Sequence, residues 1–436
     1  MIGITTKQAP TPNAVVPYFI GSAVSLLAFG IFLFLLSDIP ELEYLQSEVI
    51  ALTHIITLGI ITMMAMGTMH QFIPVVFQAS LRFEKLAIWN FFLFLISLIF
   101  FIYSFYTHRL FNSLIIASSM IVISIWIFIF NIIATYLKAK KTDIAARFIL
   151  TALFWLIMTT IYGLLQAYNF KYSFLGTNTL DYLKIHITFG LIGWLLILII
   201  GVSSIIVPMF LISHRFVDKN KLKYSYIFIN TGIIIAWISY QFNEKQFLIY
   251  LAWVFIILGI LSYLIYIFQS FKFKKKRLDI AMKHAMTAFI FSIIPIALSV
   301  LILFNKNVMP DLSESRIYIL YIISILLGIY TNLILGITYR TLPFIVWLYK
   351  FQKYLGKAKV PKPEQLYFEK AGNIQFFLYL SMLIILFAGF VFNNKLLINI
   401  SAILILISAT LFNINVFTII FKNHKINENS TRNKGN

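Results

Sequence analysis

Long apolar runs separated by short polar connections make up most of this chain of 436 residues. Twelve runs are close to the length that crosses a bilayer. Backbone groups in hydrocarbon must find partners within the chain, so we expect helices, and no segments alternate apolar and polar residues as a membrane barrel requires. The pattern predicts an all-α, polytopic membrane protein of about twelve transmembrane helices, at 15–37, 47–72, 88–107, 113–137, 144–168, 184–210, 223–241, 247–270, 280–304, 316–346, 371–391 and 395–421.

Composition agrees with a membrane protein and removes several kinds of chemistry. Hydrophobic residues make up 61% and charged residues 11%, whereas a soluble domain is about a quarter charged. Cysteine is absent, which excludes disulfides, zinc–thiolate sites, iron–sulfur clusters and covalently attached heme. The first apolar run is too long for the core of a signal peptide, so we predict no cleaved leader.

The net charge of +20 is distributed unevenly along the chain. The N-terminus, the C-terminus and the connections after even-numbered spans hold 28 of the 35 Lys and Arg residues, whereas the other connections hold 7. Because cytoplasmic loops carry the Lys and Arg excess, both termini are predicted to be cytoplasmic, in the cell membrane. Basic stretches such as 272–277 then face anionic lipid. We expect the lipid bilayer as partner and no nucleic acid.

A motif of glycine followed seven residues later by proline occurs three times, 134 and 135 residues apart. Asp143 and Asp279 open two further matching segments. Glycine allows close helix approach, and proline is expected to end or kink each helix at the cytoplasmic surface. We predict one transmembrane domain, 1–436, with a pseudo-threefold repeat of three four-helix arcs (about 1–139, 140–274 and 275–425) and a polar tail, 426–436. The motif residues are Gly67 and Pro74, Gly201 and Pro208, and Gly336 and Pro343.

Two histidines fall at similar depth on equivalent spans, because His54 precedes Pro74 by 20 residues and His186 precedes Pro208 by 22. Intramembrane histidines mark candidate functional sites, and imidazole suits iron or copper. The alternative is that each is a hydrogen-bonded interior histidine. His284, near the start of its span, is expected to cap the membrane interface.

Other polar residues carry weaker signals. Met66 and His70 share a helix face and could form a copper(I) set, although methionine more often fills gaps in a core. On a uniform α-helix His70 lies about 160° around the axis from His54. Arg340 either extends to the cytoplasmic surface or contacts an anionic group.

The spacing of His54, Gly67 and Pro74 resembles that in subunit I of the heme-copper oxidase superfamily, nearest the nitric oxide reductase branch. That subunit also has twelve spans in three arcs. The resemblance implies that His54 is a heme axial ligand and that His186 stands at the first copper-ligand position.

Several family ligands are missing from this chain. Tyr321 and Ile323 stand where the family carries the histidines that ligate both hemes, and span 223–241 has no histidine. The resemblance therefore implies a protein with at most a b-type heme and an open site for a diatomic gas, without copper. Its expected role is in respiration or nitric oxide metabolism, together with respiratory-chain subunits. If it is an enzyme, it is an oxidoreductase, without full oxygen-reducing activity. The alternatives are a cofactor-free transporter or permease, and a non-catalytic partner of a respiratory complex.

Overall fold

The computed structural model describes residues 8–36, 43–139, 143–213, 217–242, 246–275, 278–304, 314–355 and 357–422, and the regular elements of these segments are helices. Twelve of them are long and apolar enough to cross a membrane, which confirms the predicted number. Most predicted bounds agree to within a few residues; the largest extensions are at the start of the sixth span, which begins at Gly176, and at the end of the tenth, which reaches Tyr354. The predicted tail at 426–436 lies outside the described segments.

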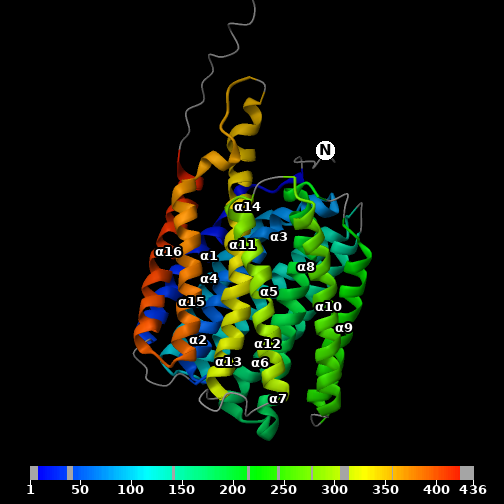
Figure 1. Cartoon of the computed structure of the whole chain (residues 1–436), viewed down its shortest axis with the longest axis vertical. Coiled ribbons are helices and arrows are strands. Elements are labelled where there is room, and N and C mark those ends of the chain that lie inside the picture. The colour runs from blue at the N-terminus through cyan, green and yellow to red at the C-terminus, as the bar shows by residue number, and fades with distance from the viewer. Residues whose placement is uncertain are drawn as a thin grey trace, which may run out of the picture. The chain divides into compact units, whose positions relative to one another are not determined.

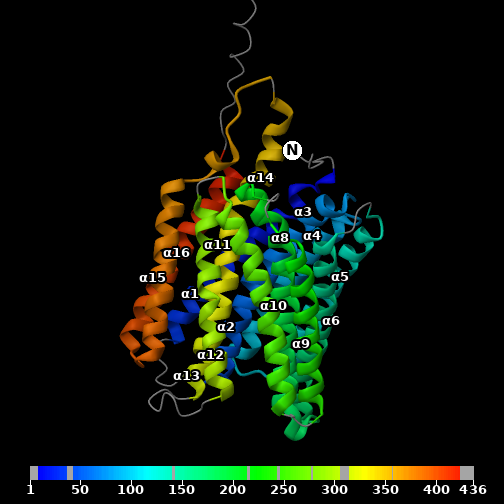
Figure 2. The same cartoon turned by 45° about the vertical axis from the view of Figure 1, so that its right-hand side comes forward.

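The described chain divides into two compact units. The first contains Met1–Phe72, Phe83–Phe91 and Leu278–Asn436. Its pairs α15–α16 and α11–α14 run side by side (Figures 1 and 2). Its elements are η2 (Pro12–Ala14), α1 (Val16–Leu36), α2 (Ser47–His54), η3 (Ile55–Thr62), most of α3 (Met63–Phe77), the start of α4 (Glu84–Tyr106), α11 (Ile280–Phe291), α12 (Ile293–Phe304), α13 (Glu314–Ile323), η6 (Ser324–Thr331), α14 (Asn332–Phe351), η7 (Gln352–Tyr354), η8 (Pro363–Leu366), α15 (Glu369–Val391) and α16 (Lys395–Phe421).

The second unit contains Ile73–Arg82 and Phe92–Arg277. Helices α9 and α10 pack along their lengths (Figure 2), and α6 packs on α5 and α8. Besides the end of α3 and most of α4, its elements are α5 (Asn112–Tyr136), α6 (Ile144–Tyr172), η4 (Gly176–Asn178), α7 (Thr179–Ile187), η5 (Thr188–Leu196), α8 (Ile197–Leu211), α9 (Asn220–Gln241) and α10 (Gln246–Lys272).

In each unit, polar side chains donate hydrogen bonds from one helix to its neighbour. In the first unit the Ser22 hydroxyl donates to the carbonyl of Ile60 at 2.8 Å, which ties α1 to η3. In the second, the Trp155 indole donates to the Asn230 side-chain oxygen at 2.8 Å, which ties α6 to α9. An unpaired polar group in hydrocarbon is costly, so each bond both satisfies a donor and selects a neighbour.

The glycines of the three repeated motifs occupy the same kind of contact. Each lies where a Cβ atom would meet the first turn of another helix. The facing atoms are a carbonyl oxygen and the Cβ of the residue three positions later. These two residues are Val15 and Tyr18 for Gly67, Ala145 and Phe148 for Gly201, and Ala281 and His284 for Gly336. Only glycine permits this approach without displacement of the facing backbone.

We expected each proline to end or kink its helix, and two of the three helices end shortly after their proline. Helices α3 and α8 end three residues after Pro74 and Pro208, and α14 continues for eight residues after Pro343. The carbonyls of Pro74 and Pro208 accept hydrogen bonds from Ala79 and Ser213, which close the two shorter helices. Residues after Pro343 can extend α14 because a proline interior to a helix removes only one donor.

We predict that Gly336→Ala destabilises the protein by about 1–3 kcal/mol. Its Cβ would stand 2.7 Å from the carbonyl oxygen of Ala281, so the backbone of α11 would have to move. Gly190→Ala is the control, because its Cβ would meet the side chain of Thr159 at 3.2 Å. Thermal unfolding in detergent should show a clear loss for the first variant only. Equal midpoints for the two variants would contradict this account of the contact.

Candidate functional site

The second, sixth and tenth spans each change from α-helix to π-helix partway along their length. Each π-helical segment ends 12 residues before the proline of the repeated motif. Such wide turns inside α-helices are rare and often occur at functional sites. The segments are η3, η5 and η6, and each candidate histidine or tyrosine lies in the α-helical turn that precedes its segment.

His54 is the last residue of α2 and directly precedes η3. Its Nδ1 lies 2.8 Å from the carbonyl oxygen of Ile50, one turn earlier. A carbonyl oxygen only accepts, so Nδ1 carries the proton and the lone pair is on Nε2. Metal-ligating histidines commonly donate their other nitrogen to a backbone carbonyl in this way. The half-buried His54 imidazole is therefore in the tautomer that a metal ligand needs.

His186 lies near the end of α7, in the second unit. Its Nδ1 lies 2.9 Å from the carbonyl oxygen of Thr159 on α6. Its Cε1 lies 2.8 Å from where a Cβ of Gly163 would stand, so the ring rests on the bare backbone of α6. The contact ties α7 to α6, as expected for a hydrogen-bonded interior histidine. A metal-binding role for His186 stays a prediction.

Tyr321 lies on α13, where it is half-buried. Its backbone carbonyl accepts a hydrogen bond from the Ser324 hydroxyl at 2.7 Å, at the point where η6 begins. The π-helical segments η3 and η6 pack directly on each other. Replacement of a family ligand by Tyr321 stays a prediction.

Met66 and His70 are buried in α3. The His70 ring meets the edge of the Tyr18 ring, with 5.2 Å between their centroids. The Thr338 hydroxyl donates to the sulfur of Met64 at 3.7 Å, so α3 also packs into the first unit on the side of Met64. These contacts are typical of core packing, and copper binding by the pair stays a prediction. The angle of 160° between His54 and His70 is wrong, because it assumed α-helical turns through η3.

His284 is fully buried, so the expectation that it caps the interface is wrong. Its Nδ1 lies 2.6 Å from the side-chain oxygen of Asn332 and its Nε2 lies 3.3 Å from that of Gln375. The Gln375 amide nitrogen donates to the Ser408 hydroxyl at 3.1 Å. Four helices, α11, α14, α15 and α16, therefore meet through hydrogen bonds around one imidazole.

Two further side chains extend this group toward the C-terminal end of α16. The Tyr339 hydroxyl donates to Gln375 at 3.4 Å and accepts from Asn415 at 3.4 Å. Asn415 also accepts from the backbone nitrogen of Phe368 at 3.0 Å. We define the His284 cluster as His284, Asn332, Tyr339, Gln375, Ser408 and Asn415. It contains neutral amides, hydroxyls and one imidazole, a set that can hold or pass a proton.

The sequence holds a signal for the His284 cluster. Asn332, Gln375 and Asn415 are polar residues inside apolar spans, and polar residues in spans usually face other helices. A second glycine also precedes each motif glycine by eight residues, at Gly59, Gly193 and Gly328. Gly193 packs on Trp155, and Gly328 packs on Phe291.

Arg340 forms an ion pair with Asp279. The other carboxylate oxygen of Asp279 accepts from the backbone nitrogen of Met282 at 3.0 Å and caps α11. Burial raises the pKa of the nearby Tyr367 phenol, and the Asp279 carboxylate raises it further, so this phenol stays neutral. Arg340 therefore has a partner within the chain rather than extending alone to the surface.

Comparison with known proteins identifies a fold and no sequence family. No protein-family model matches the sequence, and no curated protein sequence matches it. A solved structure, a cryo-EM structure of a heme-copper terminal oxidase dimer, is similar with a TM-score of 0.68. The alignment covers 95% of this chain and 85% of that chain, at 12% sequence identity. This chain therefore has the fold of a chain in that oxidase, with little of its sequence.

We predict that His284→Leu costs about 2 kcal/mol or more, because it leaves two buried amides without the imidazole that they face. His284→Leu combined with Asn332→Leu should recover part of the loss, since one of those amides is then gone. Thermal unfolding of the two variants in detergent measures both effects. A double variant less stable than His284→Leu alone would contradict the predicted recovery.

We also predict that Arg340 and Asp279 are coupled by about 1 kcal/mol or more, since their side chains are only 13% and 26% exposed. A double-mutant cycle with Arg340→Gln and Asp279→Asn measures this coupling. Asparagine keeps an oxygen that can cap α11, so the cycle isolates the charge interaction. Additive losses of stability would show that the pair is not coupled.

Proposed function

We propose that this chain is a divergent, heme-associated membrane protein like subunit I of the heme-copper oxidases, acting in respiration or nitric oxide metabolism. In this proposal the Nε2 of His54 is the axial ligand of a b-type heme. The chain lies in the cytoplasmic membrane with both termini inside. In this proposal the chain belongs with the nitric oxide reductase branch, as the spacing of His54, Gly67 and Pro74 suggests.

The arrangement of spans supports the proposal. The oxidase fold extends over 95% of the chain. Gly67, Gly201 and Gly336 make equivalent helix contacts, and three π-helical segments stand at one distance from three prolines. We therefore propose the pseudo-threefold arrangement of three four-helix arcs that the oxidase resemblance implies.

The hydrogen bond from His54 Nδ1 to Ile50 carries the heme assignment. It selects the tautomer in which Nε2 can donate its lone pair to iron, and it orients the ring. His54 directly precedes η3, and η3 packs directly on η6. The proposal therefore assigns the heme to the part of the first unit beside the start of η3.

A heme with a single protein ligand supplies an open position at which a diatomic gas can bind. Tyr321 and Ile323 stand at the positions of further family ligands, and α9 contains no histidine. We therefore do not include a three-histidine copper site in the proposal. If the protein catalyses a reaction, the proposal makes it an oxidoreductase that receives electrons from another respiratory subunit.

Visible spectroscopy tests the proposal directly. Wild-type protein purified in detergent from heme-replete cells should show a reduced-minus-oxidised heme band, with about one heme per chain by pyridine hemochrome. His54→Ala should lose the band. His186→Ala is the matched control, because it removes an imidazole with the same Nδ1-to-carbonyl bond and should keep the band.

The size-exclusion profile and unfolding midpoint of each variant show whether a lost band reflects misfolding. Carbon monoxide or nitric oxide should shift the wild-type band if the sixth position is open. Wild-type protein without heme would overturn the proposal and favour a cofactor-free transporter or a non-catalytic respiratory partner. A band retained by folded His54→Ala would overturn the assignment of the ligand.

A further inference from the structure

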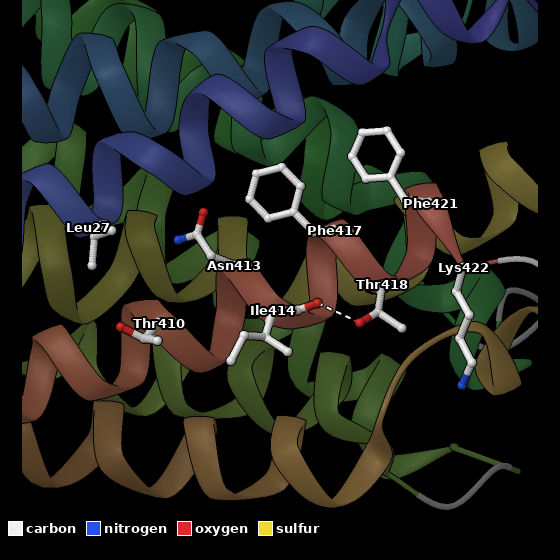
Figure 3. Close-up of a pocket in the computed structure, with 8 residues that line it drawn as sticks. All are labelled: Leu27, Thr410, Asn413, Ile414, Phe417, Thr418, Phe421 and Lys422. Atoms are coloured by element: carbon white, nitrogen blue, oxygen red, sulfur yellow. Dashed lines mark hydrogen bonds between the residues drawn. The ribbon is translucent and has the colours of Figure 1, made fainter.

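A groove of about 600 Å³ runs along α16 beside α1 in the first unit (Figure 3). Leu27 contributes from α1, and residues from Thr410 to Lys422 contribute from α16 and its end. The α16 part extends from Thr410 to Phe421, about 16 Å along the helix. This length is about half of the hydrocarbon core of a bilayer.

The groove opens on apolar side chains that face away from the protein. Ile414, Phe417 and Phe421 are 46%, 38% and 65% exposed, and they belong to a helix that is long and apolar enough to cross a membrane. The rings of Phe417 and Phe421 stack with 6.0 Å between their centroids, and Figure 3 shows them on one side of α16. The groove therefore presents hydrocarbon to whatever occupies it.

The polar groups along the groove have their hydrogen bonds within the chain. The hydroxyls of Thr410 and Thr418 donate to the carbonyls of Leu406 and Ile414 at 2.8 and 2.7 Å. The Asn413 amide donates to the carbonyls of Ala23 and Ala409, each at 2.8 Å. An occupant of the middle of the groove therefore needs no polar group, as is true of an acyl chain.

Two cations stand at the C-terminal end of α16, and one of them lines the groove. Lys422 lines the groove, and its Nζ lies 4.7 Å from the centre of the Phe368 ring. Lys350 donates from Nζ to the carbonyl of Ile420 at 2.7 Å, which places its ammonium at the last turn of α16. The apolar span that could cross a membrane ends at Phe421, so we expect these ammonium groups at the level of lipid headgroups.

We propose that the groove is a binding site for an anionic phospholipid. One acyl chain lies along α16 against Ile414, Phe417 and Phe421, and the phosphate is bound by Lys350 and Lys422. The apolar groove supplies affinity for any phospholipid, and the two lysines supply the preference for an anionic headgroup, because a basic side chain near the surface attracts anionic lipid. The site does not depend on heme binding.

Lipid titration of the detergent-purified full chain, followed by native mass spectrometry, tests this site. Dioleoyl phosphatidylglycerol should bind more tightly than dioleoyl phosphatidylcholine. Lys350→Ala with Lys422→Ala should weaken phosphatidylglycerol binding by about fivefold per lysine and remove the preference. Lys395→Ala, at the opposite end of α16, is the matched control and should change neither affinity.

Ile414→Trp fills the groove and should weaken binding of both lipids, whereas Ile407→Trp, on α16 outside the groove lining, should not. Equal wild-type affinity for the two lipids, or an unchanged double lysine variant, would overturn the proposal. Inorganic phosphate that competes as strongly as phosphatidylglycerol would indicate an anion site instead. Loss of self-association in Ile414→Trp without any change in lipid binding would assign the groove to a second copy of the chain.

Discussion

Close packing at Gly67, Gly201 and Gly336 is the contact on which the rest of this structure depends. At each, a helix approaches the first turn of another so closely that the facing Cβ atom, and at Gly336 also a carbonyl oxygen, leaves no room for a side chain. Lipid provides no hydrophobic force between helices, so such packing has to stabilise the bundle. The contact also fixes the position along the helix axis of the residues that precede each glycine. These include the π-helical segment and the candidate ligand before it.

The three contacts share a backbone arrangement but differ in the side chain that they bring into the interior. The position three residues after the facing carbonyl is Tyr18 in the first copy, Phe148 in the second and His284 in the third. Tyr18 donates to the carbonyl of Ala87 at 2.8 Å, Phe148 packs on Tyr226, and His284 organises its cluster. One fold motif thus supports three chemical environments, and only the third gathers amides around an imidazole.

The bilayer makes each buried polar group costly, and this chain satisfies most of them locally. Serine and threonine hydroxyls donate to carbonyls one turn earlier, as in the groove beside α16. His54 does the same with Ile50. His186 and His284 instead bond to other helices, so their imidazoles hold α7 on α6 and α11 on α14 and α15. The histidine hydrogen bonds therefore differ in whether they stay within one helix or tie separate helices together.

The sequence by itself determined the membrane class, the number of spans and most of their bounds, because burial in hydrocarbon needs about twenty apolar residues for each helix. It also located the glycines, whose regular spacing reflects a repeated contact. It could not locate the π-helical segments, which depend on packing and which invalidate angles computed for a uniform α-helix. Nor could it show that His284 is buried or that Arg340 pairs with Asp279. Those facts depend on residues about 48 to 91 positions away in sequence, and only the tertiary structure brings such groups within hydrogen-bonding distance.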